Sequence, residues 1–311
     1  MDITRTDIAN AQRRIEGDIR RTPLLRMPGS HLGIDCAELW LKLEHLQVSG
    51  SFKARGMFNR MRANAIPGAG VVIASGGNAG IAVAYAAKAL GVRCEVFVPE
   101  TTSRAKRDKL AQLEAVLSVG GSSYADALTA SLERQAQTGA LLMHAYDQPE
   151  VVIGAGTLAA EVEADAGVPD RVLVSVGGGG LIAGIAAWFE QRCRIVALEP
   201  ELAPTLFRAR EANRPVDVEV SGIAADSLGA RRIGKIAWDL TQRHVHAAHL
   251  VGDPAIRSAQ QAWWSELRLA VEPAAALPLA ALTTGIVAPG RDEKVLLVIC
   301  GANVDLASLA I

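Results

Sequence analysis

A lysine in a turn of small residues is the first position in this chain that could do chemistry. Lys53 lies in the segment SGSFKARG at residues 49–56, which has the pattern of a helix start. The pKa of a free lysine amine is about 10.4, but removal from water and a neighbouring cation both lower it. An amine made neutral in this way can attack a carbonyl carbon and form a Schiff base. One lysine proves little, so other motifs must support this chemistry.

Two glycine-rich turns, each between a strand and a helix, could bind anionic groups. The first is SGGNAG at residues 75–80, which follows the apolar run VVIA and precedes an alanine-rich helix. The second consists of four consecutive glycines at 177–180, between a strand over 171–176 and a helical run over 181–189. Backbone N–H groups at a helix N-terminus attract anions, and glycine allows close approach to the backbone. We expect the tetraglycine turn to bind a phosphate group.

The composition is that of a globular protein without an obvious nucleic-acid or membrane partner. The chain has 311 residues, half of them hydrophobic, and a formal net charge of -1. Its charges are scattered, which disfavours nucleic acid and anionic membranes as main partners. No apolar run reaches the roughly 18 residues that cross a bilayer, and the N-terminal residues lack the apolar core of a signal peptide. The four cysteines form no C-x-x-C pair, so we predict a reducing, cytoplasmic location.

The hydrophobic periodicity predicts an α/β protein in which strands and helices alternate. Helices are predicted over 4–18, 53–63, 79–90, 103–114, 123–137, 153–166, 180–190 and 254–268, with another opening within 271–276. Strands are predicted over 38–43, 71–75, 94–98, 116–119, 140–143, 171–176, 194–199 and 295–300, and residues 200–230 are predicted to be irregular. Open α/β sheets bind ligands at the carboxyl ends of their strands. We therefore expect the motif segments to converge at one cleft.

Four motifs, in this order, resemble the fold-type II enzymes that use pyridoxal 5′-phosphate (PLP), specifically the serine/threonine dehydratase family. They are SGSFKARG, SGGNAG, VGGGGL and the terminal CGAN at 300–303, and the resemblance covers nearly the whole chain. It implies two open, twisted, mostly parallel α/β sheet domains, similar to the tryptophan synthase β chain, with the cofactor in the cleft between them. It also implies a large PLP-binding domain of residues 1–47 plus 148–311 and a small domain of residues 48–147.

The resemblance implies a role for each motif residue. Lys53 would hold the cofactor and would also remove the Cα proton of the substrate. The other cofactor contacts would come from Phe52, Asn78, Gly177, Gly178, Gly179, Gly180, Leu181 and Cys300. The substrate carboxylate would be bound by Ser75, Gly76, Gly77 and Ala79. Glu199 and Glu272 would support the site from behind.

Several positions refine the expected reaction. Cys300 would face the pyridine nitrogen, and because a thiol cannot protonate that nitrogen as a carboxylate would, β-elimination is favoured over transamination and racemisation. Gly76 stands where racemases of this family carry a serine, and Ala79 matches the serine-dehydratase branch. Glu199 is retained from the family's divalent-metal loop, but Thr205 stands where an acidic ligand is expected. We therefore predict no metal site.

The predicted function is that of a PLP-dependent ammonia-lyase. It would eliminate water from L-serine or L-threonine and give pyruvate or 2-oxobutyrate plus ammonia, working as a homodimer on a free amino acid. PLP-dependent β-replacement, as in cysteine or cystathionine synthesis, and 3-hydroxyaspartate dehydration are alternatives. An NAD-dependent dehydrogenase is another, because Gly178, Gly180 and Ala183 fit G-x-G-x-x-A and Glu199 ends the next strand. A binding protein that keeps the fold without catalysis is the alternative from a different class.

Overall fold

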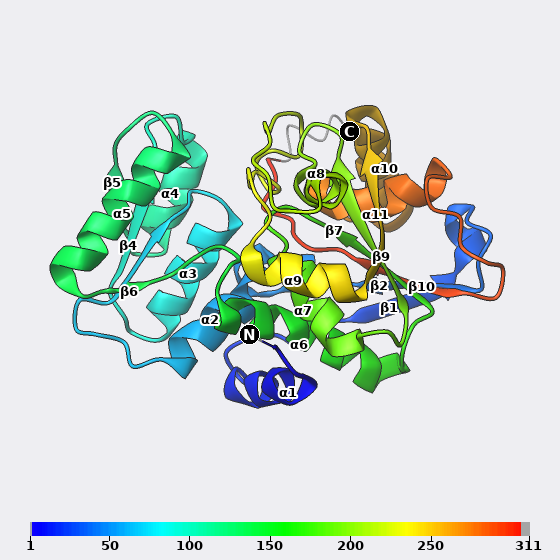
Figure 1. The fold of residues 1–311 in the computed structure, drawn as a ribbon, viewed down its shortest axis with the longest axis horizontal. Helices are drawn as coiled ribbons and strands as arrows, with labels where there is room; N and C mark the ends of the chain where they lie inside the picture. Colours follow the sequence, from blue (N-terminus) through cyan, green and yellow to red (C-terminus); the bar gives the residue numbers. More distant parts are fainter. Residues whose placement is uncertain (1, 306–311) are drawn as a thin grey trace.

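Two α/β lobes of unequal size make up the part of the chain described by the computed structural model, residues 2–305 (Figure 1). The larger lobe is built on a six-stranded sheet in the order β1-β2-β10-β7-β8-β9, and the smaller on a four-stranded sheet in the order β5-β4-β3-β6. Only the pairing of β1 with β2 is antiparallel among the described strands. The predicted α/β class with two mostly parallel sheets is confirmed.

The strands lie close to the predicted segments. Those of the large sheet are β1 (Leu24–Pro28), β2 (Glu38–Lys42), β7 (Arg171–Ser175), β8 (Arg194–Pro200), β9 (Val245–Val251) and β10 (Lys294–Val298). Those of the small sheet are β3 (Val71–Ala74), β4 (Cys94–Val98), β5 (Val116–Val119) and β6 (Leu141–Leu142). All strands of the small sheet fall within residues 48–147 and all strands of the large sheet fall outside them. The exact domain boundaries remain a prediction.

Helices cover both faces of the large sheet. The helices are α1 (Arg5–Arg14), α2 (Lys53–Ala63), α3 (Asn78–Ala89), α4 (Arg104–Gln112), α5 (Tyr124–Thr138), α6 (Pro149–Ala166), α7 (Gly180–Phe189), α8 (Thr205–Ala212), α9 (Lys235–His244), α10 (Asp253–Leu267) and α11 (Pro273–Thr283). Figure 1 shows α10 and α11 on one side of this sheet and α6 and α7 on the other, with α3, α4 and α5 around the small sheet. No helix among residues 2–305 is both long enough and apolar enough to cross a membrane.

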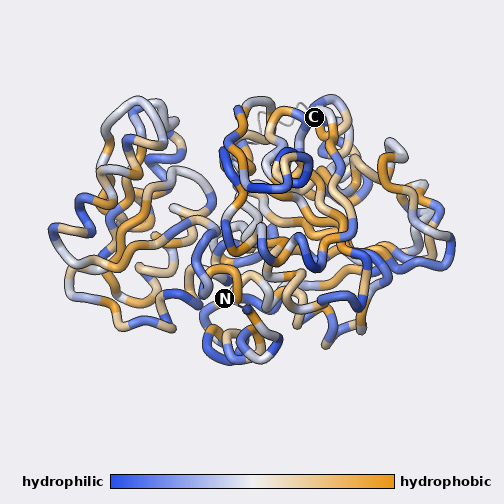
Figure 2. The backbone as a smooth tube through the Cα atoms, viewed as in Figure 1, coloured by the Kyte–Doolittle hydropathy of each residue, from blue (hydrophilic) through white to orange (hydrophobic). Residues whose placement is uncertain are grey.

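The core of each lobe follows from the sequence pattern of its strands. Val172, Leu173 and Val174 of β7 are consecutive and fully buried, as expected for a parallel strand covered on both faces. Figure 2 shows the same arrangement throughout, with hydrophobic segments in the interior of each lobe and hydrophilic ones outside. The sheets are therefore rigid supports for the loops at their carboxyl ends.

Helix α2, which begins at Lys53, lies against α6 at the junction of the lobes. A Cβ atom on Gly56 would lie 2.7 Å from the carbonyl oxygen of Val151, and one on Gly154 would lie 2.5 Å from that of Arg55. The two helix backbones thus touch where they cross, which only glycine permits. This close crossing fixes the start of α2 relative to the large lobe.

The predicted irregular stretch is partly wrong, and several boundaries shift. Residues 200–230 contain α8, and residues between 230 and 254, for which no element was predicted, form α9 and β9. Helix α8 is short, and its start is fixed by Glu199 at the end of β8, whose carboxylate accepts the N–H groups of Leu206 and Phe207. Helix α6 begins four residues earlier than predicted, at Pro149, and α1 ends at Arg14 rather than at 18.

Candidate active site

A small cavity lies where the glycine turns, the Lys53 turn and the end of β10 meet. Its lining includes every residue that we predicted to contact the cofactor, together with others that we did not. The lining residues are Phe52, Lys53, Asn78, Ser175, Gly177, Gly178, Gly179, Gly180, Leu181, Ser227, Leu228, Glu272, Ala274 and Cys300. The cavity measures about 40 Å³, far below the roughly 300 Å³ or more of an ordinary small-molecule pocket. The lobes or the side chains must therefore move to admit a larger molecule.

The amine of Lys53 is held at the wall of this cavity. Its Nζ donates a hydrogen bond to the carbonyl oxygen of Ala145 at 2.7 Å and lies 5.0 Å from the centre of the Phe52 ring. Burial lowers the pKa of Lys53 to about 8, and the nearby Cys300 and Glu272 offset only part of this effect. A useful fraction of the amine is thus neutral near physiological pH, as a nucleophile or a base requires.

The C-terminal end of β10 holds the turn that presents Lys53. The N–H of Phe52 donates to the carbonyl of Cys300 at 3.0 Å, and the N–H of Ala302 donates to the carbonyl of Gly50 at 2.9 Å. Gly50 has a φ of +78°, which suits glycine, and a Cβ atom there would lie 2.7 Å from Oδ1 of Asn303. Segments more than 200 residues apart in the sequence therefore set the position of the lysine together.

The tetraglycine turn offers backbone N–H groups at the start of α7. Among the described residues, no partner accepts a hydrogen bond from the N–H groups of residues 177–181. A Cβ atom on Gly178 would lie 2.3 Å from the ring of Tyr146, and Gly179 has a φ of +88°. Free N–H groups, close packing and the positive end of the helix dipole together fit the phosphate group of PLP.

Asn78 joins the lobes through a buried carboxyl group. Its Nδ2 donates to both oxygens of Glu272, at 2.9 and 2.8 Å, and its Oδ1 accepts from Nδ2 of Asn303 at 2.6 Å. Burial raises the pKa of Glu272, and the hydrogen bond from Asn78 opposes this shift. Glu272 was predicted to stand behind the site, but it lines the cavity itself. Asn78 and Glu272 thus link the two lobes at the wall of the cavity.

The side chain of Cys300 is buried in the cavity wall beside Lys53 and Glu272. Burial is the main cause that raises the pKa of its thiol well above the usual range. The thiol is therefore neutral at physiological pH and can form a hydrogen bond without supplying negative charge. This is the property that the predicted contact with the pyridine nitrogen requires.

The turn predicted to bind the substrate carboxylate lies beside the cavity rather than in its lining. Ser75, Gly76, Gly77 and Ala79 connect β3 to α3 and are not among the lining residues. The Oγ of Ser75 accepts from the N–H of Gly77 at 3.3 Å, and a Cβ atom on Gly77 would lie 3.5 Å from the carbonyl oxygen of Asp226. The turn thus lies close to Asp226 of the other lobe, and its substrate role remains a prediction.

Glu199 lies outside the cavity, beneath the tetraglycine turn. Its carboxylate contacts the hydroxyl of Thr205 at 2.8 Å and accepts the N–H groups of Leu206 and Phe207, both at 2.7 Å. Burial raises the pKa of Glu199 to about 7, although these hydrogen bonds oppose the shift. A carboxyl group turned into α8 cannot reach a ribose in the cleft, which removes the basis of the dehydrogenase alternative.

Several residues that shape the site carry no motif by which they could have been predicted. Ser227 and Leu228 belong to the stretch predicted to be irregular, yet they line the cavity. Tyr146 follows directly after Ala145, which accepts the Lys53 hydrogen bond, and its ring packs on Gly178. Ser175 could have been found, because it is the last residue of β7, two residues before the glycine turn.

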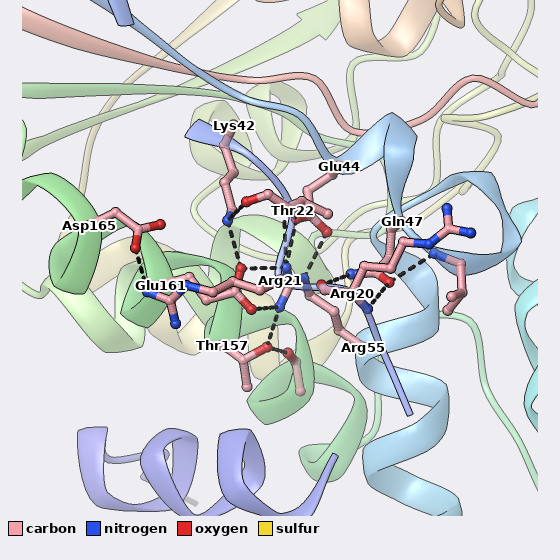
Figure 3. Close-up of polar contacts among 12 residues, drawn as sticks. Arg20, Arg21, Thr22, Lys42, Glu44, Gln47, Arg55, Thr157, Glu161 and Asp165 are labelled. Carbon is pink, nitrogen blue, oxygen red and sulfur yellow. Dashed lines mark hydrogen bonds and ion pairs between the residues drawn. The ribbon is translucent and has the colours of Figure 1, made fainter. Parts of the chain in front are cut away.

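A buried network of charges supports the helix that begins at Lys53 (Figure 3). Arg55, fully buried, donates from Nε and Nη2 to the two carboxylate oxygens of Glu44, each at 2.7 Å. It also donates to Glu161 at 2.7 Å, and Lys42 donates to the second oxygen of Glu161 at 2.6 Å. Two positive and two negative groups thus compensate one another inside the protein and tie α2 to α6 and to the end of β2.

Comparisons with known proteins agree with this geometry. The family model described as pyridoxal-phosphate dependent enzyme matches residues 15–301. The phenylserine dehydratase of Ralstonia pickettii is 33% identical over 97% of this chain and 94% of its own length. The solved structure of maize serine racemase has a TM-score of 0.92 and 29% identity, over 100% of this chain and 96% of that one. A solved threonine deaminase from T.th. has a TM-score of 0.91 and 32% identity, over 98% and 99% of the two chains.

The family match, the two sheets and the lysine facing a glycine turn point to one conclusion. The chain belongs to the pyridoxal-phosphate-dependent enzymes of fold type II, with serine/threonine dehydratases among its relatives, and its cofactor is pyridoxal 5′-phosphate.

Proposed function

We propose that this protein is an ammonia-lyase that eliminates water from L-serine or L-threonine and releases pyruvate or 2-oxobutyrate together with ammonia. The observation that carries the proposal is the position of Lys53, whose amine has a pKa lowered to about 8 and lies on the same cavity as Cys300 and the tetraglycine turn. When bound, PLP supplies an electron sink for the negative charge that develops at Cα of an amino acid.

The residues of this chain bind the cofactor and the substrate and move the proton. Lys53 would hold the cofactor through Nζ, and the same amine, when free, would remove the Cα proton of the substrate. The N–H groups of residues 177–181 would bind the phosphate, and the side chain of Asn78 would bind the ring hydroxyl. The turn at 75–79 binds the substrate carboxylate after the lobes open. Glu272 fixes the orientation of the Asn78 amide through two hydrogen bonds.

The neutral thiol of Cys300 supports elimination over racemisation. A neutral thiol facing the pyridine nitrogen would make PLP a weaker electron sink, which would favour loss of the β-hydroxyl over reprotonation at Cα. Gly76 supports the same conclusion, because it provides no side chain to act as a second base. The likeness to serine racemase makes this distinction a necessary part of the test.

The test is an assay of 2-oxo acid release from a panel of amino acids. We expect pyruvate from L-serine or 2-oxobutyrate from L-threonine, no D-serine, and loss of nearly all activity in Lys53→Ala. Lys235→Ala, at an exposed position at the start of α9, is the matched control and should keep full activity. The panel includes L-phenylserine, because the relative from Ralstonia pickettii is a phenylserine dehydratase, and 3-hydroxyaspartate.

The outcomes separate the alternatives. A protein that binds PLP but releases oxo acid from no member of the panel, and instead joins a thiol to an activated serine, would replace the proposal with β-replacement. Formation of D-serine faster than pyruvate would replace it with racemisation.

We further propose that the protein is a cytoplasmic homodimer. Four free cysteines support a reducing compartment. Light scattering is expected to give about twice the 32.7 kDa mass of one chain, and fractionation of cells is expected to place the protein with cytoplasmic enzymes. A particle of single-chain mass would contradict the dimer.

A further inference from the structure

The segment beneath the tetraglycine turn does not have the chemistry of a cation site. The resemblance to serine/threonine dehydratases implies a divalent-metal loop over residues 199–205. In this chain, however, Glu199 faces the hydroxyl of Thr205 and the N–H groups of Leu206 and Phe207. N–H groups point hydrogen atoms at the carboxylate, whereas a hard divalent cation requires six or more oxygen ligands. Across residues 2–305, no group of three or more metal-ligating side chains gathers here or elsewhere.

The hydroxyl of Thr205 lies between two oxygen atoms. Its Oγ1 is 2.7 Å from the carbonyl oxygen of Gly177 and 2.8 Å from Oε1 of Glu199. All three residues are buried. A hydroxyl has one proton and two lone pairs, so it satisfies both neighbours when it donates its hydrogen bond to the carbonyl and accepts a hydrogen bond from a protonated Glu199 carboxyl group.

Gly177 is the first residue of the turn that we assign to the phosphate, so the direction of its carbonyl matters. In a trans peptide the C=O of one residue and the N–H of the next point in opposite directions. A carbonyl of Gly177 directed at Thr205 therefore turns the N–H of Gly178 away from α8. The carbonyl of Gly178 is held in the same manner, because it accepts the N–H of Gly234 at 3.0 Å.

We propose that Thr205 is a positioning residue, which bridges Glu199 to Gly177 and holds the tetraglycine turn with its N–H groups available for phosphate, in place of a divalent cation. The proposal rests on the phosphate role of this turn in the proposed function. It goes beyond that role by assigning the orientation of the turn to one hydroxyl group. Cofactor binding in this chain is then independent of divalent cations.

The experiment measures the dissociation constant of PLP for the apo form of the wild type, Thr205→Val and Thr205→Ser, each with excess EDTA or with Mg²⁺. Valine keeps the shape but leaves the Gly177 carbonyl and Glu199 without the hydroxyl, so we expect about tenfold weaker PLP binding. Serine keeps the hydroxyl, so Thr205→Ser should bind PLP within about twofold of the wild type. Neither EDTA nor Mg²⁺ should change the wild-type constant or the melting temperature of the apo protein.

Thr241→Val is the matched control, because Thr241 is a buried threonine whose hydroxyl bonds only within α9, to Trp238. It should lower the melting temperature about as much as Thr205→Val does but leave PLP binding unchanged. If Thr205→Val binds PLP as tightly as the wild type, the positioning role is wrong. If EDTA weakens PLP binding by the wild type and Mg²⁺ restores it, the proposal that Thr205 takes the place of a divalent cation is wrong. Wild-type protein that does not bind PLP at all would instead overturn the proposed function, and this inference with it.

Discussion

Burial acts on single residues of the cleft in opposite directions, depending on the charge that each would carry. It lowers the pKa of the Lys53 amine to about 8 and raises the pKa values of Cys300 and Glu272. In each case the shift favours the neutral form, because burial removes the group from water. A neutral amine next to a neutral thiol is a suitable setting for an aldehyde cofactor.

The pH dependence of cofactor attachment tests the state of Lys53. Because the pKa is lowered to about 8 from 10.5, the neutral fraction of the amine at pH 7 rises roughly 300-fold. We expect the rate at which apo protein attaches PLP to increase with pH and to level off just above 8. Stopped-flow absorbance measures this rate. A rate still rising steeply above pH 10 would contradict the lowered pKa.

The same shift affects stability. Between about pH 8 and 10.5 the unfolded chain holds a proton on Lys53 that the folded apo protein has lost. The contribution of this group to the free energy of unfolding therefore increases with pH across that window. Below pH 8, burying the protonated amine destabilises the folded protein by the full amount. Urea denaturation of wild type and Lys53→Met at pH 7 and 10 measures the difference, with the variant expected to gain stability at pH 7.

Gly178 gives a second prediction for a single residue. A Cβ atom there would lie 2.3 Å from the Tyr146 ring, so Gly178→Ala must displace either the ring or the turn. We expect PLP binding at least tenfold weaker, which corresponds to about 1.4 kcal/mol. Gly68→Ala is the control, because a Cβ atom on Gly68 meets nothing within 4 Å. Unchanged binding in Gly178→Ala would show that the turn does not need its present packing.

The elements around the site are positioned by contacts between distant parts of the chain. Helix α2 crosses α6 at Gly56 and Gly154 and is tied to the large lobe by Arg55, while the end of β10 holds the turn before it. The strands and most helices could be predicted because their periodicity is local. Helix α8 could not, because its first turn is capped by Glu199 from another element rather than by a neighbouring residue.

The buried network of Figure 3 yields a prediction for these elements. Arg55→Met leaves the carboxylates of Glu44 and Glu161 buried without their main partner, so we expect a loss of about 3–5 kcal/mol in the free energy of unfolding. Arg62→Met removes a partly exposed ion pair with Asp18 from the same helix and should cost less than about 1 kcal/mol. Chemical denaturation measures both, and equal losses would contradict the assigned role of the network.

For the molecule as a whole, the sequence predicted where the cleft lies, but it did not predict the contacts that join the two lobes across it. The four motifs converge as predicted because glycine-terminated strands of both sheets end there. Ser75, Gly76, Gly77 and Ala79 lie beside the cavity instead of lining it, and Gly77 lies close to Asp226 of the other lobe. Two side-chain contacts also join the lobes: Lys106 with Asp226 at 2.8 Å and Lys109 with Asn303 at 2.7 Å. The motifs did not predict these contacts, because neither lysine belongs to a motif.

These cross-lobe contacts predict how the molecule opens. The ion pair of Lys106 is partly exposed, so each contact contributes little alone and is weakened by salt. We expect the double variant Lys106→Ala, Lys109→Ala to show faster amide exchange in α4 and at residues 226–228, with exchange in β7 unchanged. Hydrogen exchange read by mass spectrometry tests this expectation, and unchanged exchange in α4 would mean that other contacts hold the lobes together.

The attachment of the cofactor to Lys53 underlies every other assignment in the cleft, and borohydride reduction followed by peptide mapping examines it without relying on activity. Reduction makes the bond between PLP and its lysine permanent, so the mass of the modified peptide identifies the residue. We predict that the cofactor is found on the peptide containing Lys53 and on none of the other lysine peptides, and that Lys53→Ala carries none. Stoichiometric labelling of any other lysine in the wild type, with Lys53 unmodified, would show that the site has been assigned to the wrong residue.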